Sequence, residues 1–154
     1  MINFEVFGMK NYEIENIVFD LNGTLAVDGI VNAEVIERLQ ELGKLLKVYI
    51  LTADTFGTAS ALSSSVPFAY IVRIQSGKDK YEFVKNIDPK KTIVIGNGNN
   101  DLLMMKTAAI SIAVIGIEGC STKAAMASDI LVNNIIDAMD LILKPKRLIA
   151  TLRI

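Results

Sequence analysis

The sequence predicts a single α/β domain in which helices cover both faces of a central, mainly parallel β-sheet, giving three layers. Short apolar runs rich in Val and Ile alternate along the chain with segments of helical periodicity. The 154 residues are 51% hydrophobic with a mean hydropathy of +0.40, which is enough apolar material for one substantial core. We therefore expect residues 1–154 to form one domain without a linker.

The predicted strands differ in how their apolar residues are arranged. The first two alternate polar and apolar positions, which is typical of half-exposed antiparallel strands. The later ones are continuous apolar runs, which are typical of parallel strands buried on both faces. Between Leu25 and Ile30, the pair Asp28-Gly29 predicts the two-residue turn of a small hairpin. In chain order, the strands are expected at residues 2–6, 12–15, 17–20, 47–51, 68–72, 92–95, 111–115 and 130–132.

The predicted helices lie between and after these strands. Asn32 precedes a segment with apolar residues at helical spacing and is placed to cap it. The pair Asp88-Pro89 ends the third helix, because a residue before proline disfavours helical geometry. The basic residues after 143 are interpreted as a solvated helix end rather than a nucleic-acid patch. The helices are expected at about 32–45, 57–64, 81–87, from 102 onward, and 135–143.

Composition excludes several classes of function. The formal net charge is −1, so no overall field attracts nucleic acid or an anionic membrane. With no His and a single Cys, the chain has no internal disulfide, no His/Cys zinc site and no histidine base. The longest uncharged apolar stretch, residues 107–117, is shorter than the roughly 20 residues of a membrane helix. We expect a cytoplasmic protein without nucleic-acid or membrane partners, and the apolar content is compatible with a homo-oligomer.

Four polar clusters are placed to meet at the carboxyl edge of the predicted sheet, where ligands bind in open α/β folds. An aspartate at a strand end can attack phosphorus and form an acyl phosphate. A Thr hydroxyl and neighbouring backbone N–H groups can hold phosphate oxygens, and a lysine can neutralise the transferring group. A glycine-rich loop with a carboxylate can hold Mg²⁺. These clusters are Asp20 to Thr24, Thr52 to Asp54, Lys80, and Gly96 to Asp101.

Each cluster alone also has a structural interpretation. Asp20 can close an Asx-turn, and Thr52 or Asp54 can cap a helix. Lys80 can be a solvated surface lysine, with Lys78 as a rival for its role. The glycine-rich loop can be an ordinary turn before a helix. The ordered set of all four favours a phosphoryl-transfer site.

The four motifs in this order resemble those of the haloacid dehalogenase superfamily. Within it, the chain is most similar to soluble phosphatase-like proteins related to the phosphorylation domain of P-type ATPases. The resemblance spans roughly residues 17–129 and implies a Rossmann-like fold. It implies a Mg²⁺-dependent phosphatase or phosphotransferase that acts on a small phosphorylated substrate through an aspartyl-phosphate. Residues 25–51 and 55–79 are too short to hold the cap domain that many relatives insert there, so we expect an open site.

The resemblance also assigns roles by position. The implied catalytic residues are Asp20, Asn22, Thr52 and Lys80. The implied substrate-binding residues are Gly23, Thr24, Ala53, Asp54 and Asn100. The implied Mg²⁺ ligands are Asp20, Asn22 through its main-chain carbonyl, Asn97 and Asp101.

Two positions depart from the family pattern. Asn22 stands where ordinary phosphatases of the superfamily carry an aspartate as general acid and base, whose loss typically costs about 10²–10⁴-fold in rate. Asn97 stands where the family has its principal metal-binding aspartate. We therefore expect slow turnover and weak metal binding. The same departures leave open a silent phosphate- or nucleotide-binding protein, and kinship alone suggests a regulatory partner of a membrane ATPase.

Overall fold

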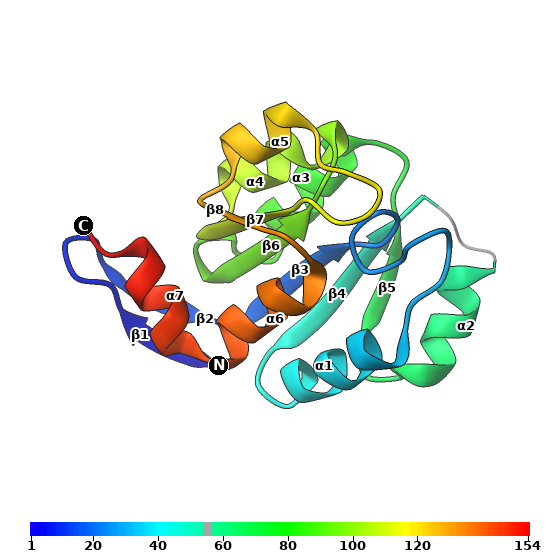
Figure 1. Ribbon diagram of the computed structural model, residues 1–154, viewed down its shortest axis with the longest axis horizontal. Coiled ribbons are helices and arrows are strands. Elements are labelled where there is room, and N and C mark those ends of the chain that lie inside the picture. Colours follow the sequence, from blue (N-terminus) through cyan, green and yellow to red (C-terminus); the bar gives the residue numbers. More distant parts are fainter. Residues whose placement is uncertain (54–56) are drawn as a thin grey trace.

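Six parallel strands form the centre of the computed structural model, which describes residues 1–53 and 57–154. They lie in the order β5-β4-β3-β6-β7-β8, with helices on both faces (Figure 1). This confirms the predicted three-layer α/β fold with a parallel sheet. The strands are β3 (Asn16–Asp20), β4 (Lys47–Thr52), β5 (Tyr70–Arg73), β6 (Thr92–Gly96), β7 (Ile110–Val114) and β8 (Ile130–Val132).

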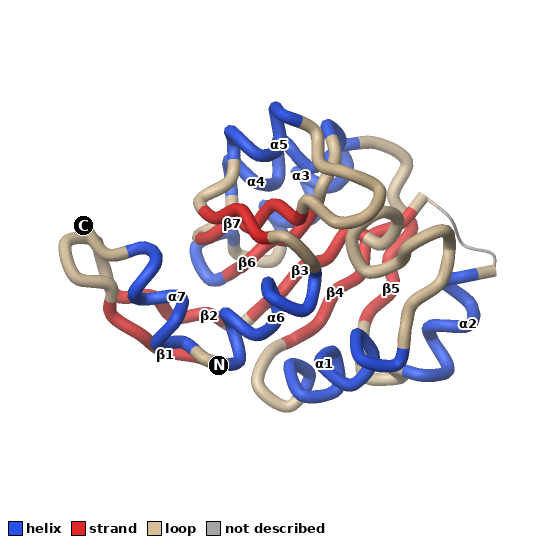
Figure 2. The backbone as a smooth tube through the Cα atoms, in the orientation of Figure 1, coloured by secondary structure: helices blue, strands red, loops and turns tan. Residues whose placement is uncertain are grey.

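Side chains of the central strand β3 point alternately to the two faces of the sheet, and each face carries its own apolar core. Ile17 and Phe19 point into one core and Val18 into the other, and all three are fully buried. Figure 2 shows the helices that cover each face of the sheet. One face carries α1 (Ala33–Gly43), α2 (Thr58–Ser65) and α6 (Ile135–Leu143). The other face carries α3 (Gly77–Asn86), α4 (Leu102–Thr107) and α5 (Thr122–Ala127).

The N-terminal hairpin lies at the amino edge of the sheet and is not part of it. Strands β1 (Ile2–Glu5) and β2 (Asn11–Ile14) pair antiparallel, as predicted, and β1 packs on α7 (Pro145–Leu152) (Figure 1). Glu15 joins the hairpin to the sheet. Its N–H donates to the Lys91 carbonyl and its carbonyl accepts from the Lys47 N–H, both at 2.9 Å.

Local signals in the sequence explain the segment that follows the central strand. The hairpin turn at Asp28 and Gly29 has positive φ at both residues, 50° and 77°, as a two-residue turn of this type requires. Asn32 then caps α1, because its Oδ1 accepts from the Val35 N–H at 3.0 Å. Both features confirm the sequence predictions.

Several boundaries differ from the predictions. The third strand of the sheet begins at Tyr70, not at 68, because residues 66–69 form a turn closed by the Ala69 N–H and the Val66 carbonyl at 3.0 Å. The fifth is β7, which runs one residue earlier than predicted. Helices α5 and α7 were not predicted as separate elements, since α5 is short and α7 is amphipathic but basic at its start. Two 3₁₀ turns, η1 (Pro89–Lys91) and η2 (Asn99–Asp101), were also not predicted.

None of the helices in the described residues is both long enough and apolar enough to cross a membrane. In the same residues, the segments after β3 and after β4 hold only the small hairpin with α1, and α2 with β5. Neither segment contains a second folded unit that would cover the carboxyl edge of the sheet.

Candidate functional site

The order of the strands reverses between β3 and β6, which creates the crevice where ligands bind in doubly wound folds. The chain passes from β3 outward to β4 and β5 and then returns to the other side of β3 (Figure 1). Asp20 is the last residue of β3 and pairs in register with Leu51, so Thr52 lies one position further along the same edge. Gly96 ends β6 and begins the loop that reaches Asp101. Three of the predicted clusters therefore meet at one edge.

A buried ionic cluster stands at this point. Lys80 of α3 donates through Nζ to Asp20 Oδ1 at 2.6 Å and to Asp101 Oδ1 at 2.7 Å. The exposed fractions of the three side chains are only 3%, 9% and 0%, respectively. Charges this deeply buried are stable only when they are paired. Lys80, and not the exposed Lys78, is therefore the lysine of the site.

Asp101 organises the loop rather than facing the pocket. Its Oδ2 accepts from the backbone N–H groups of Asn97 and Gly98, both at 3.0 Å, while Oδ1 accepts from Lys80. Gly96 packs directly against it, since a Cβ at that position would lie 2.4 Å from the carboxyl group. Both oxygens of Asp101 are thus engaged within the protein, and its role as a Mg²⁺ ligand stays a prediction.

Three oxygens converge on the other side of Asp20. Thr24 Oγ1 lies 3.3 Å from Asp20 Oδ2 and 3.2 Å from Asn97 Oδ1. Asn97 Nδ2 donates to the Gly119 carbonyl at 3.0 Å, which leaves its Oδ1 on the side of Thr24. Gly23 has a positive φ of 78°, and a Cβ there would lie 2.5 Å from Asn97 Nδ2. Because a hydroxyl has one proton, Thr24 serves only one of the two acceptors at a time.

The donor set fits a hard divalent cation. Mg²⁺ binds carboxylate, amide and carbonyl oxygens, and Asp20 Oδ2 and Asn97 Oδ1 both lie within hydrogen-bond distance of the same hydroxyl, that of Thr24. Among the described residues, no group of three or more His, Cys, Asp or Glu could hold a metal, and a Mg²⁺ ion here would be held by one carboxylate and one amide oxygen. Such a site binds with less charge than a cluster of aspartates.

The electrostatics of the cluster show a shortage of positive charge. Burial, followed by the charge of Asp101, raises the pKa of Asp20 from 3.8 to about 6, although Lys80 and Thr24 act in the opposite direction. Burial acts to lower the pKa of Lys80, but the two carboxylates outweigh it and the net shift is upward. Lys80 therefore stays charged, while Asp20 keeps a raised pKa because one ammonium faces two carboxylates.

A pocket of about 150 Å³ opens on Asp20 and Lys80. Four further residues predicted from the sequence line it, namely Asn22, Thr52, Ala53 and Asn100. Gly23 and Thr24 lie on the Asn97 side of Asp20 and are not among the lining residues. The predicted residue Asp54 lies outside the described residues.

Sequence reasoning missed the lining residues Ile74, Gln75 and Ser76. A signal for them exists, because Ser76 and Asp79 form a capping box at the start of α3. The Asp79 N–H donates to Ser76 Oγ at 3.2 Å, and the Ser76 N–H donates back to Asp79 Oδ2 at 3.0 Å. This box sets the helix start four residues earlier than predicted and brings the preceding residues to the same pocket as Lys80.

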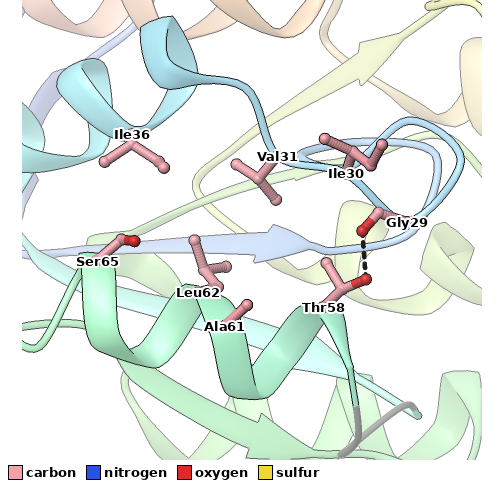
Figure 3. Close-up of a pocket in the computed structure, with 8 residues that line it drawn as sticks. All are labelled: Gly29, Ile30, Val31, Ile36, Thr58, Ala61, Leu62 and Ser65. Carbon is pink, nitrogen blue, oxygen red and sulfur yellow. Dashed lines mark hydrogen bonds between the residues drawn. The ribbon is translucent and has the colours of Figure 1, made fainter.

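A second pocket, of about 250 Å³, lies between the hairpin, α1 and α2 (Figure 3). Figure 3 shows that Ile30, Val31 and Leu62 point into it, and that Thr58 donates a hydrogen bond to the Gly29 carbonyl. None of the titratable side chains in the described residues lines it. The pocket at Asp20, by contrast, is lined by the titratable side chains of Asp20 and Lys80.

Comparison with known proteins finds a matching family model and several relatives. The sequence model of a family of haloacid dehalogenase-like hydrolases matches residues 75–125, which include Lys80 and the loop to Asp101. A soluble P-type ATPase-like phosphatase from Methanocaldococcus jannaschii is 26% identical over 148 residues, 86% of this chain and 54% of that protein. The chain thus spans about half the length of that relative.

Two further matches show how widely the similarity extends. The uncharacterized protein MJ0073 of Methanocaldococcus jannaschii is 51% identical over 72 residues, 47% of this chain and 77% of that protein. The crystal structure of 3-deoxy-D-manno-octulosonate 8-phosphate phosphatase from Moraxella catarrhalis, in complex with magnesium, phosphate and KDO, superposes with a TM-score of 0.69. It is 21% identical and covers 91% of this chain and 94% of its own, which shows a shared fold.

Proposed function

Because the chain belongs to the haloacid dehalogenase-like hydrolases, we propose that it is a Mg²⁺-dependent phosphatase or phosphotransferase that works through a phosphorylated Asp20. The observation that carries this proposal is the buried cluster of Asp20, Lys80 and Asp101 beside a small polar pocket. A structural role alone would not require two carboxylates and one ammonium to be buried together at a sheet edge, because burying charges is costly.

In the proposed reaction, a carboxylate oxygen of Asp20 attacks the phosphorus atom of a small phosphorylated substrate. Lys80, which contacts Asp20, is placed to offset charge on the transferring group. Thr52 is buried and lines the same pocket, as does Ala53, whose backbone N–H is proposed to bind phosphate oxygens. Asp101 keeps Lys80 charged and in position.

Asp20, Asn97 and the main-chain carbonyl of Asn22 are the residues that would hold Mg²⁺. When bound, the ion would supply positive charge to the phosphoryl group and to Asp20. The orientation of Asn97 supports this assignment, since its amide nitrogen donates to the Gly119 carbonyl and its oxygen lies by Thr24 Oγ1, which also contacts Asp20. A neutral amide in this position implies weaker Mg²⁺ affinity than a carboxylate would give.

Turnover is expected to be slow. Asn22 lines the pocket and carries neither an acidic proton nor a basic site, so it cannot replace a general acid and base. The missing group corresponds to a rate loss of about 10²–10⁴-fold. A slow second step would let the phosphorylated form of Asp20 accumulate, and acid-quenched samples would then contain a phosphoprotein.

The test is hydrolysis of a generic phosphate ester with Mg²⁺ by the wild type and by Asp20→Asn. Asp137→Asn on the exposed surface of α6 is the matched control, because it makes the same chemical change away from the site. We expect turnover in the wild type and the control and none in Asp20→Asn. Equal rates in all three proteins would contradict the proposal. Phosphate binding without any turnover would instead support the silent phosphate-binding alternative.

A further inference from the structure

The described residues that line the pocket at Asp20 include no side chain free to donate a proton to a leaving group. Among the described residues that line it, Asp20 and Lys80 are the only titratable side chains. Lys80 is committed to Asp20 and Asp101 at 2.6 and 2.7 Å, where it balances two negative charges. A leaving group that needs a proton as its bond to phosphorus breaks therefore has no partner among these side chains.

The mouth of the pocket instead carries neutral hydrogen-bonding side chains. Asn22 follows β3, Gln75 precedes α3, and Asn100 lies in η2, so three separate elements each contribute one carboxamide. All three residues are exposed at this edge, and the hydroxyl of Ser76 accompanies them. Carboxamides donate hydrogen bonds through NH₂ without changing their charge. They suit an anionic group that accepts hydrogen bonds, not one that must be protonated.

We infer that this site selects acyl phosphates of small carboxylic acids, and this inference rests on the function proposed above. A carboxylic acid has a pKa near 4, so its anion leaves without a proton, whereas a phenol has a pKa of about 10 and an alcohol a higher one. The pocket of about 150 Å³ is half the lower limit of about 300 Å³ for typical ligand sites, so it encloses the phosphoryl group and only the few atoms next to it.

The chemistry balances without an acid or base from the protein. In the first step, an oxygen of Asp20 bonds to phosphorus while the bond between phosphorus and the acyl oxygen breaks, and that electron pair leaves with the carboxylate. In the second step, water bonds to phosphorus and the bond to Asp20 breaks, which returns the aspartate carboxylate. Both hydrogens of the water end on the released phosphate. Asn22, Gln75 and Asn100 hydrogen-bond the departing carboxylate in the first step.

The first experiment compares substrates by leaving group, using the full chain with Mg²⁺. We expect kcat/KM to fall from acetyl phosphate through phenyl phosphate to glycerol 1-phosphate, with about a 10²–10⁴-fold span between the ends. Asn22→Asp supplies the missing acid and should raise kcat/KM for glycerol 1-phosphate by at least tenfold, while acetyl phosphate changes little. The slope against leaving-group pKa should therefore become shallower in this variant.

The second experiment tests the carboxamides directly. Gln75→Glu removes a donor and places a negative charge where the carboxylate leaves, so kcat/KM for acetyl phosphate should fall about tenfold or more. Phenyl phosphate should be affected less. Gln40→Glu is the matched control, because it adds the same charge on the exposed surface of α1, across the sheet. It should behave as wild type with both substrates.

The outcomes separate this inference from the proposed function. Turnover that depends on Asp20 but is similar for acetyl phosphate and glycerol 1-phosphate would overturn the inference and leave the phosphatase function in place. No Asp20-dependent turnover with any substrate would overturn both. Asp54→Asn belongs in the series, because Asp54 lies outside the described residues. A selective loss of glycerol 1-phosphate turnover in that variant would identify Asp54 as a proton donor and would also overturn the inference.

Discussion

Each end of the sheet carries one lysine–carboxylate contact. The two contacts are of nearly equal length, but one is buried and the other is largely exposed to solvent. At the carboxyl edge, Lys80 lies 2.6 Å from Asp20, with 3% and 9% of these side chains exposed. At the amino edge, Lys91 lies 2.8 Å from Glu15, with 35% and 39% exposed. An exposed ion pair contributes little to stability, because water screens its charges. A buried ion pair loses the hydration of both charges, so further hydrogen bonds must hold it in place. The comparison teaches that distance alone does not separate a functional site from a surface contact.

The pKa shifts of the two carboxylates make the same distinction. The hydrogen bond from Lys91 and then its charge lower the pKa of Glu15, as a simple ion pair should. Burial and the charge of Asp101 raise the pKa of Asp20 to about 6, despite its own lysine. Glu15 therefore belongs to a simple ion pair of one carboxylate and one ammonium, whereas the buried cluster holds two carboxylates against one ammonium.

The largest expected effect comes from removing the buried ammonium. Lys80→Met leaves two carboxylates buried side by side without a counter-charge, which typically costs about 3–5 kcal/mol of unfolding free energy. Urea denaturation at pH 8 in EDTA measures it. Lys78→Met, two residues away and exposed, is the control and should unfold like the wild type. Equal midpoints for the two variants would show that the cluster is not a buried ionic site.

The next largest effect is a gain in the free energy of unfolding rather than a loss. A carboxyl group whose pKa is raised on folding stabilises the folded state at a pH below 3.8, which is its pKa in the unfolded chain. This stabilisation is lost as the pH rises through about 6, which is its pKa in the folded protein. Asp20→Asn removes that penalty, so the metal-free variant should be more stable than the wild type at pH 8 by about 3 kcal/mol, from a shift of about two units at 1.36 kcal/mol per unit. The difference should vanish near pH 4. A variant no more stable at pH 8 would contradict the raised pKa.

A smaller effect concerns the metal. Asn97→Asp restores a carboxylate beside Asp20 and should tighten Mg²⁺ binding by about tenfold, since affinity follows the charge of the ligands. Titration calorimetry with Mg²⁺ alone measures this without any enzyme assay. Asn133→Asp, at an exposed loop position, adds the same charge elsewhere and should not change the affinity. Unchanged affinity in Asn97→Asp would remove Asn97 from the metal site.

The smallest effect is expected at the amino edge. Lys91→Met breaks the exposed contact with Glu15, and its midpoint of denaturation should stay within experimental error of the wild type at pH 7. A loss comparable with that of Lys80→Met would mean that the two lysine–carboxylate contacts do not differ as their burial indicates.

Much of the site could be predicted because its signals are local. An apolar run that ends in Asp20, a strand followed by Thr52, and a glycine-rich loop after β6 are patterns within a few residues of sequence. The lining residues Gln75 and Ser76 were missed because their position depends on where α3 begins. The contact that orients Asn97 was missed because Gly119 lies 22 residues away, beyond any local pattern.

The amino-acid sequence by itself determined the α/β class, the run of parallel strands and the order of the four motifs, because periodicity and turn chemistry act between near neighbours. Tertiary structure alone decided that Lys80 and not Lys78 contacts Asp20. It also decided that both oxygens of Asp101 accept hydrogen bonds within the protein, from Lys80 and two backbone N–H groups, and that the pKa of Asp20 is raised. The physical reason is that burial and charge depend on segments 21 to 60 residues apart, which only the folded chain brings together.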